Sequence, residues 1–127
     1  MNNQKNIVLC GVGGQGTVLA SKLLAAAAMS KDIPVMSAET IGMAQRGGSV
    51  FSHLRMGDNL YSPMIETGTA DLIIGFEPGE TVRMLPYLKD HGHIVVSTRA
   101  VKPVTATLSG SDYDCLLYTS DAADEAR

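Results

Sequence analysis

The chain has few of the residues with which proteins hold redox centres and metal ions. Its 127 residues include two cysteines, three histidines and no tryptophan. Cys10 and Cys115 are too few for a four-cysteine iron–sulfur cluster, and they cannot frame a disulfide-rich fold. The histidines have no partners at the spacing of metal ligands, so no metal site is expected.

The chain also lacks a strong excess of one sign of charge and long apolar runs. The formal net charge is −3 and the basic residues are scattered, which gives no electrostatic footprint for nucleic acid. No apolar run approaches the ~20 residues that cross a membrane. The short polar start, Met1–Asn6, is not followed by the apolar region of a signal peptide. These features favour a cytoplasmic protein that binds neither nucleic acid nor membrane.

The most informative segment is a glycine-rich turn. Ile7–Cys10 predicts a buried strand and Thr17–Met29 predicts a helix, and between them Gly11–Gly16 has the spacing G-x-G-x-x-G. Glycines let backbone N–H groups approach an anion, and the start of a helix adds partial positive charge. The turn therefore predicts a cofactor-binding site for a group such as a phosphate. Its candidate residues are Gly11, Gly13, Gly14, Gln15, Gly16 and Thr17.

Two other interpretations of this turn stay open. In the first, the glycines only permit a tight turn and close packing of the helix on the strand. In the second, the turn belongs to a dinucleotide site, and Glu39 holds the ribose from its position just after the apolar run Pro34–Ala38. The spacing of the glycines alone does not distinguish these interpretations.

A second glycine-rich loop carries an arginine. Residues 42–48 read G-M-A-Q-R-G-G. Arginine makes bidentate contacts with carboxylate or phosphate, and loops that follow the strands of an open α/β sheet lie along one edge. We expect the two loops to form one anion pocket or docking surface; the alternative is an exposed, hydrated loop. The candidate residues here are Gln45, Arg46, Gly47 and Gly48.

The order of predicted elements indicates an α/β fold with an open, mostly parallel, Rossmann-like sheet and helices on both faces. Apolar runs at Asp71–Phe76 and His93–Ser97 predict strands covered on both sides. The helix between them is expected to begin near Pro78 and to reach Leu88, unless Pro86 kinks it or ends it.

An inserted β-hairpin is expected within this sheet. Apolar and polar residues alternate over Ser49–Met56, which predicts a strand with one face open to solvent or a partner. His53 would lie on that open face as a surface or interface residue. Leu60–Ser62 is expected to be the return strand.

The sequence contains no serine, histidine and acidic residue in the pattern of a hydrolase, so no catalytic residue is predicted.

The last residues are expected to be foreign to the fold. Cys115–Glu125 resembles the translated read-through of a sequencing-library adapter over eleven consecutive residues, and such scars do not inform the fold. The domain is therefore assigned to residues 1–114, as a unit truncated at its C-terminus, and residues 115–127 to a non-native tail. The alternative for the tail is a short amphipathic helix.

Four segments occur in the order and spacing of one enzyme family. They are Gly11–Gly16 (GVGGQG), Gly42–Val50 (GMAQRGGSV), Ser62-Pro63 and Gly75–Glu80 (GFEPGE). With them the chain resembles the gamma domains of 2-oxoacid:ferredoxin oxidoreductases, from residue 5 to about 108. The form MAQRGG followed by S-V-F-S-H is similar to the small (beta) subunits of the indolepyruvate, or arylpyruvate, branch.

This resemblance implies a function that the residues alone do not show. Such enzymes oxidatively decarboxylate a 2-oxoacid with coenzyme A and reduce ferredoxin, and a large alpha subunit holds thiamine diphosphate and iron–sulfur clusters. The small subunit is implied to be non-catalytic, inactive alone, and to complete the complex near the active site. The alternatives are a free-standing NAD(P)-binding Rossmann enzyme and an interaction module whose loops bind no ligand.

Overall fold

The computed structural model describes residues 4–41 and 48–100. Its elements, in chain order, are β1 (Lys5–Val12), α1 (Thr17–Ser30), β2 (Val35–Ile41), β3 (Ser49–Met56), β4 (Ala70–Gly75), α2 (Pro78–Met84), the 3-10 helix η1 (Leu85–Tyr87) and β5 (Leu88–Val96). Residues 42–47 of the second glycine-rich loop and the tail at 115–127 lie outside the described residues.

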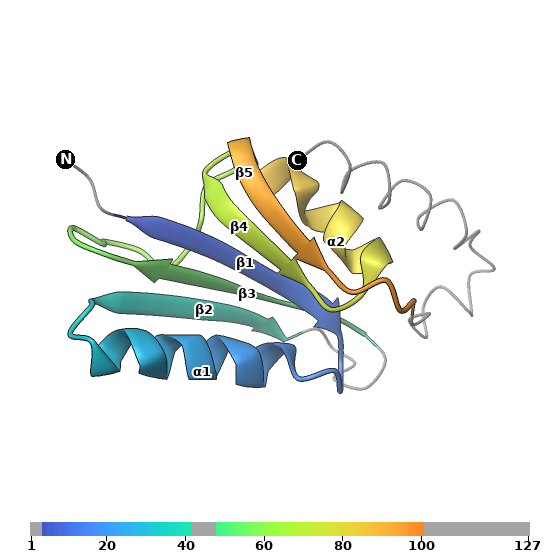
Figure 1. The fold of residues 1–127 in the computed structure, drawn as a ribbon, viewed down its shortest axis with the longest axis horizontal. Coiled ribbons are helices and arrows are strands. Elements are labelled where there is room, and N and C mark those ends of the chain that lie inside the picture. Colours follow the sequence, from blue (N-terminus) through green and yellow to red (C-terminus); the bar gives the residue numbers. More distant parts are fainter. Residues whose placement is uncertain (1–3, 42–47, 101–127) are drawn as a thin grey trace.

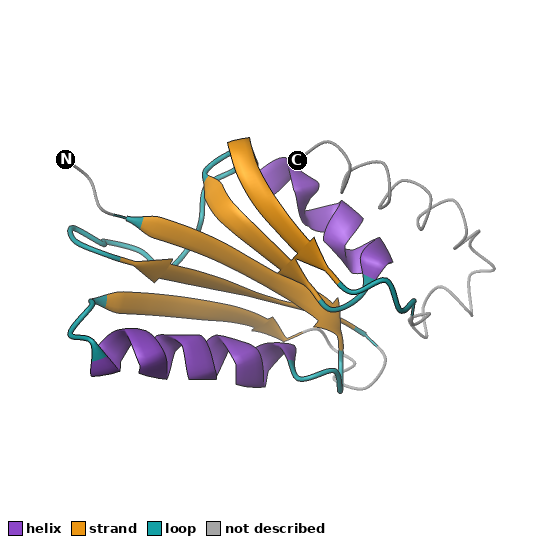
Figure 2. Cartoon of the chain, in the orientation of Figure 1, coloured by secondary structure: helices purple, strands orange, loops and turns teal. Residues whose placement is uncertain are grey.

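The five strands form one sheet in the order β2-β3-β1-β4-β5 (Figure 1). β1, β4 and β5 are parallel neighbours, whereas β3 runs antiparallel to both β1 and β2. The two described α-helices lie on opposite faces of the sheet (Figure 2), α1 mainly against β3 and β2 and α2 mainly against β1 and β4. The open, mostly parallel α/β sheet with helices on both faces is therefore confirmed.

The antiparallel strand has different partners from those predicted. β3 lies inside the sheet and pairs along its whole length with β1, from Lys5 opposite Met56 to Val12 opposite Ser49. Its other edge pairs with β2. Leu60–Ser62 forms no strand, so the predicted return strand is wrong. A three-residue segment stopped by Pro63 offers β3 far fewer ladder hydrogen bonds than β1 and β2 do.

His53 is buried, which contradicts its predicted place on an open face. The residue is 1% exposed, and its Nδ1 accepts a hydrogen bond from the Ile65 N–H at 2.9 Å. Its ring packs edge-on against Tyr87, with the centroids 5.1 Å apart. The prediction failed because alternation shows only that two faces of a strand differ, and here a loop and η1 cover the face that carries His53.

The core consists of two layers, one on each side of β1. Val8 and Cys10 point into the layer beneath α2, whereas Ile7 and Leu9 point into the layer beneath α1, where Leu54 of β3 joins them. This is the two-residue period of a strand covered on both faces. Each buried aliphatic side chain stabilises the fold by about 1.5–3 kcal/mol, so β1 is the strand on which both layers depend.

The segment after β4 follows the alternative in which Pro86 ends the helix, and its next strand begins earlier than predicted. α2 ends at Met84, and Pro86 lies in η1, because proline cannot donate the next helical hydrogen bond. The helix therefore does not reach Leu88. That residue instead begins β5, well before the predicted His93, and the ladder with β4 shifts register between Ala70 and Leu72.

Neither α1 nor α2 has the length and apolar character to cross a membrane, within the residues that the structure describes. A cytoplasmic location stays a prediction.

Replacing His53 with Asn should reduce the loss of stability at mildly acidic pH. Burial lowers the pKa of His53, so the folded chain binds a proton less readily than the unfolded chain, whose histidine titrates near ~6.5. The contribution to stability is therefore full above about pH 6.5 and falls as the pH drops below it. Asn keeps an acceptor for the Ile65 N–H and does not titrate.

The measurement is the free energy of unfolding in urea at pH 7.5 and pH 5.5. His93→Asn is the matched control for the same change of side chain at an exposed position. Equal pH slopes for the wild type and His53→Asn would contradict the assignment.

Candidate functional site

The glycine turn joins the end of β1 to the start of α1. Gly14 and Gly16 have φ values of +94° and +90°, a conformation that glycine adopts without strain. Gly16 is the N-cap of α1 and no side chain caps the helix. The first-turn N–H groups of a helix have no partners within it. This uncapped start therefore carries the partial positive charge that attracts an anion.

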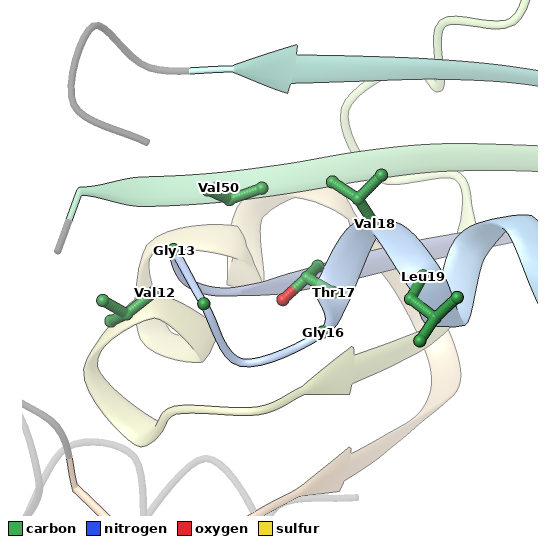
Figure 3. A pocket seen from close by; sticks show the side chains of 8 residues that line it. Val12, Gly13, Gly16, Thr17, Val18, Leu19 and Val50 are labelled. Carbon is green, nitrogen blue, oxygen red and sulfur yellow. The ribbon is translucent and has the colours of Figure 1, made fainter. Parts of the chain in front are cut away.

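A pocket of about 460 Å³ opens over this turn. Figure 3 shows it between the turn, the first residues of α1, and Val50 on β3. Its lining residues are Val12, Gly13, Gly14, Gly16, Thr17, Val18, Leu19 and Val50. The described lining is mostly apolar and carries no charged side chain. The pocket therefore suits a ligand with an apolar portion, whose oxygen atoms reach the helix start.

Gln15 is used inside the turn and does not line the pocket. Its Oε1 accepts a hydrogen bond from the Val12 N–H at 2.7 Å, and its Nε2 donates to the Phe76 carbonyl oxygen at 3.2 Å. The side chain thus ties the turn to the residue that follows β4. These hydrogen bonds hold the shape of the turn, and the predicted part of Gln15 in binding a cofactor stays a prediction.

Gly11 lies within β1, beneath the start of α1. A Cβ atom there would lie 2.7 Å from Thr17 Oγ1 and 2.8 Å from Gln15 Oε1, closer than real Cβ contacts allow. The Thr17 hydroxyl itself is buried and has no hydrogen-bond partner among the described residues. The first glycine of the motif is therefore required by close packing of the helix on the strand, as one of the open interpretations proposes.

The two glycine-rich loops meet at their described ends. The Gly13 N–H donates to the Gly48 carbonyl oxygen at 2.8 Å. Gly48 therefore lies against the first turn, as expected for two loops on one sheet edge. Gln45, Arg46 and Gly47 lie outside the described residues, so their part in the pocket stays a prediction.

The strand order disfavours the dinucleotide interpretation. Glu39 lies on β2 and pairs with Ser52 of β3, and β3 separates β2 from β1. In a dinucleotide-binding βαβ unit, the strand that carries the ribose-binding acid is the direct neighbour of the first strand. Glu39 is therefore one strand too far from the turn for that role.

Two buried acids near the site were not among the predicted site residues. Glu77 caps α2, since its carboxylate accepts hydrogen bonds from the Gly79 and Glu80 N–H groups at 2.6 and 3.3 Å. Glu80 is 3% exposed, and burial raises the pKa of its carboxyl group. The signal available in the sequence was the run E-P-G-E directly after a buried strand, which is typical of a capped helix start.

Cys10 is not a reactive thiol. Burial raises the pKa of its thiol to about 12, and the neighbouring carboxylates of Glu80 and Glu77 add to the effect. A thiol that stays protonated is neither a nucleophile nor a metal ligand. No group of three or more His, Cys, Asp or Glu side chains that could hold a metal occurs among residues 4–41 and 48–100.

Comparison with known proteins identifies the family. A family model described as pyruvate ferredoxin/flavodoxin oxidoreductase matches residues 6–127. The chain belongs to this family.

Two curated members of the family show how much of a full-length protein is present. The chain is 42% identical to the indolepyruvate oxidoreductase subunit IorB of Methanothermobacter thermautotrophicus over 108 residues, 85% of this chain and 55% of that protein. It is 31% identical to the pyruvate/ketoisovalerate oxidoreductases common subunit gamma of Thermococcus kodakarensis over 94 residues, 72% of this chain and 51% of that protein. The chain thus spans about half the length of these curated relatives.

A solved structure shares the fold. The 2-oxoglutarate:ferredoxin oxidoreductase from Magnetococcus marinus, with 2-oxoglutarate, coenzyme A and succinyl-CoA bound, superposes with a TM-score of 0.66 at 21% identity. The similarity covers 76% of this chain and 16% of that chain. The resemblance inferred from the GGQG and AQRGG motifs is therefore confirmed at the level of the pyruvate ferredoxin/flavodoxin oxidoreductase family. The assignment of 115–127 as a foreign tail stays a prediction.

Gly11→Ala should destabilise the chain through a steric clash with Thr17. Overpacking of this kind costs about 1–3 kcal/mol. The cost should shrink when Gly11→Ala is combined with Thr17→Ala, because the second change removes Oγ1, the atom nearest to the new Cβ. The measurement is a double-mutant cycle of unfolding free energies, with coupling expected in the range of about 0.5–3 kcal/mol.

Gly14→Ala is the control for this cycle. No atom lies within 4 Å of a Cβ at Gly14, so its cost comes from backbone strain, and it should add to that of Thr17→Ala. An additive Gly11–Thr17 pair would show that Thr17 is not the side chain that excludes a Cβ atom at Gly11.

Proposed function

We propose that the chain is the small, non-catalytic subunit of a 2-oxoacid:ferredoxin oxidoreductase that acts on an arylpyruvate such as indolepyruvate. The observation that carries this proposal is the 42% identity to an indolepyruvate oxidoreductase subunit over 85% of the chain. The identity to the pyruvate/ketoisovalerate gamma subunit is lower, at 31%. This difference supports the arylpyruvate branch that the MAQRGG-SVFSH segment suggests.

A larger partner subunit supplies the redox chemistry in this proposal. An iron–sulfur cluster does not fit the described residues, because their one cysteine, Cys10, is buried and holds its proton. Thiamine diphosphate and the clusters are therefore assigned to the large subunit, and electrons pass from there to ferredoxin. The isolated small subunit is then expected to be inactive.

The glycine turn contributes to the binding of coenzyme A in the assembled enzyme. Three observations support this role: the uncapped start of α1, the positive φ values of Gly14 and Gly16, and the open pocket beside them. A phosphate oxygen at the helix start satisfies free N–H groups, while the apolar lining suits the remainder of the ligand. Arg46 in the second loop would add the positive charge that the described lining lacks.

Reconstitution with a large thiamine diphosphate and iron–sulfur subunit tests the proposed function. The complex should reduce ferredoxin in a reaction that requires both indolepyruvate and coenzyme A, and it should use pyruvate or 2-oxoglutarate less well. Each subunit alone should be inactive. The readout is the rate of ferredoxin reduction with each 2-oxoacid.

Two outcomes would contradict the proposal. Binding of NAD(H) to the isolated chain at micromolar affinity would favour the free-standing dinucleotide enzyme. Full activity of a complex that carries Gly14→Val would show that the turn docks a protein and binds no ligand. In the proposal, a valine at Gly14 blocks the approach of a phosphate to the turn and raises the KM for coenzyme A.

A further inference from the structure

A polar network joins α2 to the first residue of β3. Arg83 Nη1 donates a hydrogen bond to Ser49 Oγ at 3.4 Å and lies 3.8 Å from Glu80 Oε1. Ser49 also interacts with the Glu80 carboxyl group and lowers its pKa, against the larger effect of burial. Ser49 is therefore held between a buried carboxylate and a half-exposed guanidinium group.

Ser49 occupies a position from which both sides of the glycine-turn pocket can be fixed. It lies opposite Val12 in the ladder between β1 and β3. The residue before it, Gly48, accepts the hydrogen bond from the Gly13 N–H, and the residue after it, Val50, lines the pocket. Figure 3 shows Val50 on β3 across from the turn that contains Gly13. A shift of Ser49 would therefore move one wall of the pocket relative to its floor.

The helix that holds Ser49 is itself firmly placed. Thr81 packs on Gly75 of β4 so tightly that a Cβ at Gly75 would collide with its side chain. The Thr81 hydroxyl donates to the Glu77 carbonyl oxygen at 2.8 Å, and it lies 3.8 Å from Cys10 Sγ. α2 thus contacts β1 and β4 at once and provides a fixed point for Glu80 and Arg83.

The surroundings of Glu80 oppose its ionisation. Burial is the largest cause and raises the pKa of its carboxyl group, and the nearby Glu77 carboxylate adds to this effect, while Ser49 and Arg83 lower the pKa by less. A raised pKa means that ionisation of this group costs folding free energy at neutral pH. A glutamine would avoid that cost, but it would lose the attraction of the carboxylate to Arg83. Groups with perturbed pKa values cluster at functional sites.

We propose that Glu80 and Arg83 are positioning residues for the glycine-turn pocket, and that they act through Ser49 to fix Val50 and Gly48 relative to Gly13. The inference rests on the proposed function for its catalytic consequence, since the pocket serves coenzyme A there. The effect of Glu80 and Arg83 on the position of Gly48 is a property of the isolated chain, and it is tested there separately.

The first test uses the isolated chain. Glu80→Gln should leave the free energy of unfolding unchanged or raise it, because a buried charge is removed. The same variant should speed hydrogen exchange of the Gly13 amide about three- to tenfold, because Gly48 is less firmly held. Ser49→Ala should produce the same local effect. Glu66→Gln is the matched control, because Glu66 is exposed and lies outside the network.

The second test uses the reconstituted complex with coenzyme A as the probe. Glu80→Gln and Ser49→Ala should raise the KM for coenzyme A about three- to tenfold and leave kcat near the wild-type value. An unchanged exchange rate of the Gly13 amide in the variants would overturn the proposal. A Glu80→Gln variant that loses folding stability in proportion to its loss of activity would also overturn it. An inactive wild-type complex would overturn the proposed function instead. The exchange rate of the Gly13 amide in the isolated chain would still show whether Glu80 and Ser49 hold Gly48 in place.

Discussion

At Gly11 the first turn of α1 approaches β1 so closely that no side chain fits between them. This contact determines where α1 begins and leads the chain through the positive-φ glycines that follow. The helix start is thereby left open at the carboxyl edge of the sheet, with Thr17 buried beneath it. The pocket lies at this helix start, which no side chain caps.

Much of this arrangement could be predicted from the sequence, and the exceptions have a common physical cause. The strand, glycine turn and helix at the N-terminus are local features, so their residue pattern determines them. The partners of β3, the burial of His53 and the contact of Glu80 with Ser49 depend on which distant segments pair. Periodicity carries no information on that pairing. Of the predicted site residues, Gly11 and Gln15 serve the turn itself, while Gly13, Gly14, Gly16 and Thr17 line the pocket.

In the proposed function, the chain shapes a site and leaves the reaction to a partner. Its described residues hold one cysteine, which is buried with a raised pKa, and Glu77, one of the two buried acids, caps α2. What the chain offers is backbone N–H groups at a helix start, glycines that permit close approach, and an apolar wall. These are groups that bind and orient a ligand.

In the proposed function, the glycine-turn pocket becomes part of a shared site when the large subunit binds. Amide hydrogen exchange at Gly14–Leu19 tests this most directly, measured in the isolated chain, in the complex, and in the complex with coenzyme A. We expect slower exchange on assembly and a further decrease with coenzyme A. Equal exchange rates at these amides in all three states would contradict it.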